Sequence, residues 1–281
     1  MATRSKTSAH RSLKSEKAVT SAHSPDGTQA IRRATALLKA IARATPASIS
    51  LAELSRSERL ARSTVHRMLK CLQDEGLIVQ PNGGLGYQMG PLVYELGLAA
   101  PSSALEVARW RETVDAVARR TGVTTYLMRR TGLEAVCLLK SEGRSLVRVI
   151  PVEVGQRRFL GVGAGATALL AALDDNTAET LIQLIAPELK NQPRFSADEL
   201  RLSVQQTRRS GVAISRGRVV EQSFGLGMAI PQAEGLPTLA ISIAAHLPAV
   251  TDTDTAQWSQ IIRQEIAQAL ALQKGVPTEK L

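Results

Sequence analysis

The chain has few cysteines and histidines, and no long apolar run. Its two cysteines, Cys71 and Cys137, lie far apart and lack any metal-ligand spacing, which favours a reduced cytoplasmic setting. No apolar run approaches the roughly 18 residues that a membrane span needs. Residues 1–26 contain no hydrophobic stretch of the kind that a signal peptide carries. We therefore expect a cytoplasmic protein with no membrane partner.

The sequence also lacks the side-chain clusters of common catalytic and metal sites. There are four histidines. His10 and His23 lie near the N-terminus, His66 falls on a helix discussed below, and His246 is isolated beyond an expected strand. Cys137 has no obvious histidine partner for nucleophilic catalysis. We expect no metal, no cofactor and no catalytic residue.

Positive charge is concentrated in the first third of the chain. Residues 1–90 hold 14 Lys and Arg against 6 Asp and Glu, whereas residues 91–281 hold 21 against 19. The net charge of the whole chain is +10, and +8 of it belongs to the first 90 residues. A polyanion is the partner that such a segment favours, although a basic surface that binds nothing has the same composition.

Breaks in periodicity and composition divide the chain into five parts. We expect a basic tail without regular structure over residues 1–26. The other expected parts are a DNA-binding domain at 27–90, a linker helix and hinge at 91–104, a larger domain at 105–275, and a short tail at 276–281. Within the linker, the helix covers 91–100. Pro101 and Ser102-Ser103 interrupt it, so the hinge covers 101–104.

The DNA-binding part shows the order of a winged helix-turn-helix. A helix begins near Thr28 and is ended by Pro46. Ser50 is a plausible N-cap for a second short helix. A turn near residues 57–60 leads to a third helix over 61–75, which Gly76 ends. Two short apolar segments, 77–79 and 87–89, flank the turn sequence 80–84 and predict a hairpin.

The third helix is the segment most informative about function. Its apolar face must pack on the first two helices, so the opposite face is polar and basic. Arginine can bind guanine through two hydrogen bonds, and a recognition helix presents its N-terminal residues to the major groove. The candidate DNA-contacting residues are Arg62, Ser63, Thr64, His66, Arg67 and Lys70. Cys71 on the same helix is interpreted as a small core or boundary residue.

Strands and helices are mixed through the remainder, which predicts an α+β domain with an antiparallel or mixed sheet. Strands are expected at 124–128, 135–139, 146–152, 225–230 and 238–244. A small-residue turn at 161–166 leads into a helix. Ser196 with Glu199 has the spacing of a capping box at the start of another.

Several motifs together resemble the IclR family of bacterial transcription regulators. They include Leu51-Ala52-Glu53-Leu54, the run Ser63-Thr64-Val65-His66-Arg67, and Gly86-Tyr87-Gln88-Met89-Gly90. In the second half they include Gly163-Ala164-Gly165 before an Ala-Leu-Leu-Ala helix, and Leu239-Ala240-Ile241-Ser242. The resemblance covers about residues 28–273. It implies a winged helix-turn-helix, a linker helix and a GAF-like α/β domain, at 105–275, that serves effector binding and oligomerisation.

The resemblance also implies a pocket and an assembly. The pocket floor would use backbone N–H groups near Ala164 and Gly165, where exposed amides at a helix start favour a carboxylate. The implied pocket residues are Leu160, Ala164, Gly165, Gly227, Met228 and Ser242. The implied assembly is a homodimer or a dimer of dimers on pseudo-palindromic double-stranded DNA, modulated by a small organic acid or aromatic effector.

Four positions depart from the family pattern. Arg59 stands where glycine is usual in the turn, so it would have to adopt a left-handed backbone unless the turn differs. Ala61 stands where a proline is common, and Gly161 and Thr167 replace a common His and Lys.

Two alternative functions remain at the level of sequence. Residues 161–166 fit the G-x-G-x-x-A pattern of a dinucleotide-binding oxidoreductase. The preceding strand is interrupted by Gln156-Arg157-Arg158, however, and no acidic residue follows at the required spacing. The second alternative is a DNA-binding regulator that senses no effector, with a C-terminal domain that serves only assembly.

Overall fold

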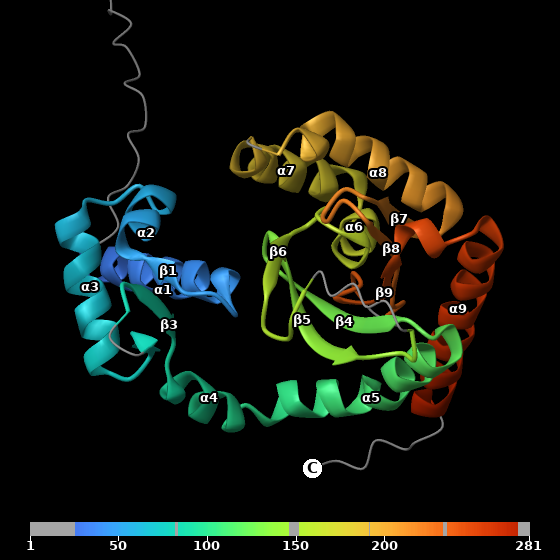
Figure 1. Cartoon of the computed structure of the whole chain (residues 1–281), viewed down its shortest axis with the longest axis horizontal. Helices are drawn as coiled ribbons and strands as arrows, with labels where there is room; N and C mark the ends of the chain where they lie inside the picture. The colour runs from blue at the N-terminus through green and yellow to red at the C-terminus, as the bar shows by residue number, and fades with distance from the viewer. Residues whose placement is uncertain (1–25, 82–83, 146–151, 191, 233–234, 275–281) are drawn as a thin grey trace, which may run out of the picture.

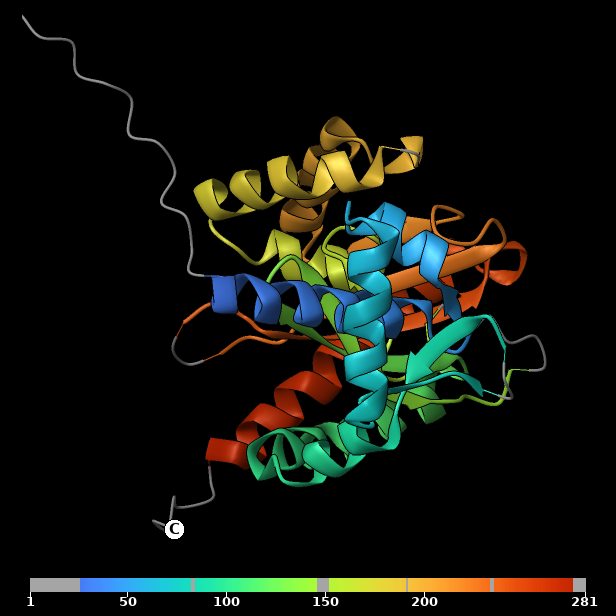
Figure 2. The same ribbon diagram turned by 90° about the vertical axis from the view of Figure 1, so that its left-hand side faces the viewer.

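The computed structural model describes residues 26–81, 84–145, 152–190, 192–232 and 235–274. Figure 1 shows two units joined by the helix α4 (Pro91–Leu98). We call residues 26–90 the head and residues 101–274 the sheet domain. Figure 2 views the molecule from the side of the head.

The head folds as the predicted winged helix-turn-helix. In chain order its elements are α1 (Asp26–Ala44), β1 (Ile49–Ser50), α2 (Leu51–Ser57), α3 (Arg62–Asp74), β2 (Ile78–Val79) and β3 (Gly86–Met89). The strands pair antiparallel in the order β1-β3-β2. The two-residue strand β1 was not predicted. Apolar side chains of the three helices, among them Leu37, Leu54 and Leu69, fill one core.

Local hydrogen bonds fix the turn that orients α3. Ser50 and Glu53 form a reciprocal capping box, in which the Ser50 Oγ accepts from the Glu53 N–H at 3.3 Å and the Ser50 N–H donates to Glu53 at 2.9 Å. After α2, Arg59 adopts a φ of 53°, a left-handed conformation that costs a side-chain-bearing residue about 1–2 kcal/mol. The Ser55 Oγ donates to the Leu60 carbonyl at 2.7 Å and braces the turn.

The connection to the sheet domain breaks earlier than expected. We predicted an interruption at residues 101–104, but α5 (Pro101–Thr121) already includes them. The chain leaves the helix only at Ala99 and Ala100. Proline at the first position of a helix costs no hydrogen bond, because that N–H has no partner within the helix. Pro101 therefore starts α5 instead of disrupting it.

Within the described residues, the sheet domain contains a six-stranded sheet with helices on both faces (Figure 1). Its strands are β4 (Thr124–Thr131), β5 (Glu134–Ser141), β6 (Arg157–Phe159), β7 (Ala213–Arg216), β8 (Ser223–Ala229) and β9 (Leu239–His246). Its helices are α5, α6 (Ala164–Ala171), α7 (Asp175–Ile185), α8 (Ala197–Ser210) and α9 (Asp252–Lys274). The strand order is β6-β5-β4-β9-β8-β7, and every pair of neighbours is antiparallel.

Alternation along the strands separates two cores. On β8, Gly225 and Gly227 face α6, whereas Leu226 and Met228 face the layer formed by α5 and α9. The core between the sheet and the layer of α5 and α9 also contains Trp110 of α5. The helices α6, α7 and α8 cover the opposite face of the sheet (Figure 1).

The antiparallel sheet rules out one alternative function. A dinucleotide-binding fingerprint works at the turn between a strand and a helix of a parallel βαβ unit. Here the strand before residues 161–166 is β6, which pairs antiparallel with β5. The oxidoreductase alternative is therefore wrong at the level of the fold.

The strand predictions for this domain were incomplete. The strands β6 and β7 were not predicted. The strand expected at 146–152 falls mostly outside the described residues, and Val152 itself is not in a strand. None of the helices in the described ranges is both long and apolar enough to cross a bilayer.

Candidate functional site

The first candidate site is the polar face of α3. Val65, Leu69 and Leu72 of this helix are buried in the head core. The side chains at the predicted DNA-contacting positions are therefore on the outer face: Arg62, Ser63, His66, Arg67 and Lys70 are exposed, and Thr64 is half-buried. The structure thus places five of the six on the exposed face of one helix and Thr64 at the boundary of that face.

The position of α3 leaves this face accessible. The helix lies at the outer edge of the head in Figure 1 and in front of the other elements in Figure 2. Its N-cap, Ala61, contributes no side-chain hydrogen bond. The first amides of α3 are thus available to a phosphate, and the basic side chains lie beside them.

The second candidate site is a pocket between α6 and the sheet. Three of the residues that the resemblance implied, Ala164, Gly165 and Ser242, line it. Gly163, the N-cap residue before α6, has a φ of 88° and no side chain to cap the helix. The first amides of α6 therefore form a floor that can accept an anion.

Tyr126 and Arg158 add polar groups to the pocket wall. Tyr126 is 2% exposed, and its hydroxyl has no hydrogen-bond partner within the described residues. Burial raises the pKa of Tyr126, so the group is a neutral donor at physiological pH. Burial also lowers the pKa of the Arg158 guanidinium from its usual value. A donor without a partner and a partly desolvated cation favour a ligand with negative charge and an acceptor oxygen.

The other implied pocket residues lie elsewhere. Leu160 is fully buried in the core on the α6 side, and Met228 points into the core on the α5 and α9 side. Gly227 lies directly under the start of α6, where a Cβ atom would come within 2.7 Å of the Ala164 carbonyl. None of these three lines the pocket.

The cysteines take different positions. Cys137 is buried, and burial raises its pKa to about 12. Cys71 is exposed, so its interpretation as a core or boundary residue is wrong. Position 71 lies on the side of α3 away from Val65, Leu69 and Leu72. No cluster of His, Cys, Asp and Glu that suits a metal occurs among the described residues.

Comparison with known proteins identifies both units. Residues 30–81 match the IclR helix-turn-helix domain, and residues 103–271 match the C-terminal domain of the bacterial transcriptional regulator IclR. The second match alone spans more than half of the chain. The chain belongs to the IclR family. It is accordingly a DNA-binding transcription regulator and not an enzyme.

Individual IclR-family relatives agree with this assignment. The chain is 28% identical over 224 residues to the HTH-type transcriptional regulator Rv1719 of Mycobacterium tuberculosis, covering 79% of this chain and 83% of the relative. A crystal structure of an ICLR transcriptional regulator from Silicibacter sp. TM1040 superposes with a TM-score of 0.71 at 21% identity, covering 90% and 99% of the two chains. An IclR homologue from Microbacterium hydrocarbonoxydans, complexed with 4-hydroxybenzoate, gives a TM-score of 0.62 at 17% identity, covering 85% and 97%. At these identities the two structures support the fold.

The departures from the IclR pattern near the pocket have local structural causes. Gly161 has a φ of 86°, and a Cβ atom there would lie 2.4 Å from the Leu200 side chain, so a histidine would not fit without rearrangement. The Thr167 Oγ donates to the carbonyls of Gly161 and Gly163, at 3.0 and 2.9 Å, and so fixes the turn. Sequence reasoning missed Tyr126 and Arg158. Tyr126 lies on β4 and Arg158 on β6, and β5 pairs with both strands. Only the register of these three strands brings both residues to the pocket.

Proposed function

We propose that this regulator binds a pseudo-palindromic operator through α3 and that a small carboxylic acid, aliphatic or aromatic, sets its operator affinity from the pocket. We also propose a cytoplasmic location, where the duplex is available. The observation that carries the DNA half is the exposed face of α3 with its three basic side chains Arg62, Arg67 and Lys70. Base contacts would come from the N-terminal half of α3, and Lys70 would contact phosphate.

The composition of the pocket supports an acid as effector. The uncapped start of α6 and the Arg158 guanidinium favour a carboxylate, and the Tyr126 hydroxyl offers a further donor. Met128 and Val162 provide apolar walls. Ser242 lies under Gly165, where an added Cβ atom would be 2.8 Å from the Ser242 hydroxyl. One solved IclR homologue carries 4-hydroxybenzoate, which combines a carboxylate with a hydroxyl and is a suitable first probe.

Exposed apolar residues on the connecting helices support an assembly. Tyr94, Leu96 and Leu98 of α4 and Leu105 of α5 are 57–72% exposed in the single chain. Several exposed apolar side chains so close together suit contact with a second copy. We propose a homodimer or a dimer of dimers whose heads bind half-sites about one helical turn, or a multiple of it, apart. The helix α4 and the break after it, at Ala99 and Ala100, would carry movement between pocket and head.

Substitution of Arg67 tests the DNA half. We expect Arg67→Ala to weaken operator binding by about 1–3 kcal/mol and to relax specificity at one base pair. The operator is first selected from a random duplex pool by the unaltered protein, and affinities are then measured by fluorescence anisotropy. Arg209→Ala is the matched control, because Arg209 is an exposed arginine on α8, which belongs to the sheet domain and not to the head. Equal affinity of Arg67→Ala and the control would contradict the assignment of this face.

Thermal shift measurements test the effector half. A panel of aliphatic acids, benzoate and 4-hydroxybenzoate is added to the full-length protein, and the corresponding primary amides serve as uncharged controls. A ligand at 100 times its Kd stabilises the folded state by about 2.7 kcal/mol. We expect stabilisation by at least one acid and none by its amide. Absence of any shift across the panel would favour the effector-independent regulator.

A further inference from the structure

A buried carboxylate connects the head to the sheet domain. Glu134 is the first residue of β5, and its side chain is only 6% exposed. Its Oε1 accepts a hydrogen bond from the Arg43 Nε of α1, and its Oε2 lies 3.3 Å from an Arg157 nitrogen on β6. The Arg43 guanidinium also lies over the Phe159 ring, 5.5 Å from its centre. A charge this deeply buried needs its partners, so loss of the Arg43 contact would disturb the site.

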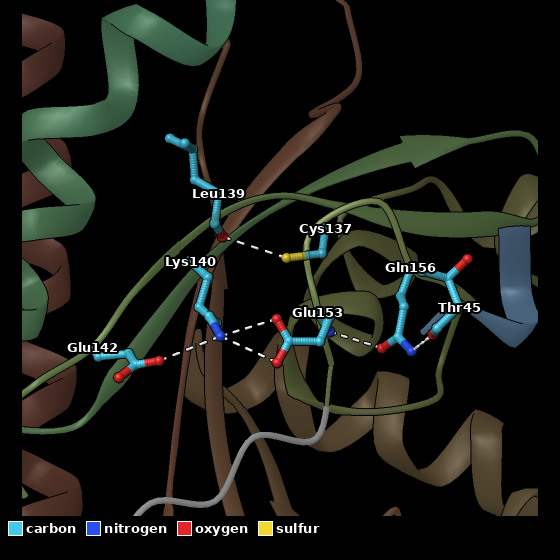
Figure 3. Close-up of polar contacts among 7 residues, drawn as sticks. All are labelled: Thr45, Cys137, Leu139, Lys140, Glu142, Glu153 and Gln156. Atoms are coloured by element: carbon cyan, nitrogen blue, oxygen red, sulfur yellow. Dashed lines mark hydrogen bonds and ion pairs between the residues drawn. The ribbon is translucent and has the colours of Figure 1, made fainter. Parts of the chain in front are cut away.

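A second contact joins the same two units a few residues away. The Gln156 side-chain amide donates to the Thr45 carbonyl, directly after α1. The Gln156 Oε1 in turn accepts from the Glu153 N–H at 2.7 Å, and the Glu153 carboxylate holds Lys140 at 2.9 Å (Figure 3). Within the sheet domain, Gln156 is thus held in place by Glu153 of the loop before β6. The chain at the end of α1 therefore contacts the sheet domain at two nearby residues, Arg43 and Thr45.

The strand β6 is the element that links these contacts to the pocket. Arg157 and Phe159 lie opposite Val136 and Glu134 on β5, and both contact the Arg43–Glu134 pair. Arg158, between them, points to the other face and lines the pocket. Among the described residues β6 is three residues long, lies at the sheet edge and pairs only with β5. A ligand that draws Arg158 inward therefore also displaces its two neighbours.

We infer that Arg43, Glu134 and Gln156 form a latch between head and sheet domain, through which occupancy of the pocket sets the position of the DNA-binding head. The latch rests on the proposed function, because it assigns regulation to the same pocket and the same head. It acts by positioning, since neither Glu134 nor Gln156 lies on α3 or lines the pocket.

The geometry also gives the direction of the effect. With the latch closed, α3 remains at the edge of the molecule remote from the sheet domain (Figures 1 and 2). The latched head can therefore bind DNA, and its fixed position reduces the entropy lost on binding. Opening the latch lowers the population of the competent arrangement, and the apparent affinity falls by the same factor.

Charge-neutral substitutions test the latch without a known effector. The variants are Glu134→Gln, Arg43→Gln and the double variant, in the full chain. The probe is a duplex selected from a random pool by the unaltered protein. We expect each single variant to bind at least about fivefold more weakly, as for a typical coupling between sites. The double variant should be no weaker than the weaker single variant, because both changes break one contact.

A matched control variant distinguishes the latch from a direct phosphate contact by Arg43. Glu179→Gln removes one partner of the Arg201–Glu179 pair between α7 and α8, which does not join the two units, and should leave affinity unchanged. A loss confined to Arg43→Gln would indicate a direct phosphate contact and overturn the latch. Losses that add in the double variant, or singles with unchanged affinity, would also overturn it. If the unaltered protein selects no duplex, the proposed function fails as well.

Hydrogen exchange provides a reciprocal test. Coupling between two sites is symmetric, so DNA bound at the head must alter the sheet domain if the latch transmits. We expect the duplex to change amide exchange at residues 157–159 in the unaltered protein and in Glu179→Gln, but not in Glu134→Gln. Equal changes with and without Glu134 would overturn the latch. Should Glu134→Gln fold poorly, Arg43→Gln replaces it, since the Arg43 side chain is 35% exposed.

Discussion

A methyl group at Gly227 is expected to destabilise the sheet domain, because it would collide with the backbone at the start of α6. Gly227 lies on β8 under the first turn of α6. A Cβ atom there would meet the Ala164 carbonyl carbon and oxygen at 2.7 Å and the Gly165 nitrogen at 2.9 Å. All three are backbone atoms, so no side-chain rotation can relieve the contact. The helix start that forms the pocket floor must move away from the sheet.

The size of the effect follows from two opposing contributions. Overpacking of this kind costs about 1–3 kcal/mol. Replacing glycine by alanine also restricts the unfolded chain, which returns about 0.4–1 kcal/mol where the native backbone accepts alanine. The φ of Gly227 is not positive, so no backbone strain adds to the cost. We expect Gly227→Ala to lower the free energy of unfolding by about 1–2 kcal/mol, or roughly 2–8 °C in Tm for a domain of this size.

Tryptophan fluorescence during urea or thermal unfolding measures this change. Both tryptophans of the chain, Trp110 and Trp258, pack in the sheet domain, so the signal reports on that domain alone. Gly225→Ala is the matched control on the same strand and face, where the nearest atom to a Cβ is the Ala164 Cβ at 3.2 Å. It should change stability much less. Equal stability of the two variants would refute the argument from close approach.

Two further outcomes are expected from buried groups. A thiol reagent at pH 8 should label one cysteine per native chain, the exposed Cys71, and two after denaturation, because burial raises the pKa of Cys137 to about 12. Rapid labelling of both native thiols would contradict the packing of β5. Tyr126→Phe should leave the ligand-free protein as stable or more stable, because it removes a buried hydroxyl without a partner among the described residues. The same variant should bind any stabilising acid more weakly, and a less stable ligand-free variant would show that the hydroxyl has another role.

The head could be predicted from sequence because its signals are local. Ser50 with Glu53, the apolar spacing of Val65 and Leu69, and Gly76 with its φ of 72° each act within a few residues. Such signals survive without knowledge of the fold. The linker was misjudged because proline was interpreted as a helix breaker. At Pro101 it occupies the first turn, where it is favoured.

The pocket could be predicted only in part. Ala164 and Gly165 lie at a helix start that sequence marks by small residues, and Ser242 came from the family resemblance. Tyr126 reaches the pocket from β4 by strand register, which sequence spacing does not reveal. Met228 was assigned to the wrong face, because one step along a strand reverses the direction of the side chain.

The strand β6 shows most clearly why tertiary context decides. The segment Gln156-Arg157-Arg158, which overlaps β6, was interpreted as an interruption of the strand that precedes residues 161–166. In the fold each arginine meets a different polar environment: Arg157 pairs with the buried Glu134, and Arg158 lines the pocket. Because successive side chains of a strand point to opposite faces of the sheet, the two adjacent arginines contact different partners. Such an edge strand has the pocket on one face and the head on the other, so no hydrophobic pattern marks it in the sequence. Its polar residues are the ones most able to connect the pocket with the head.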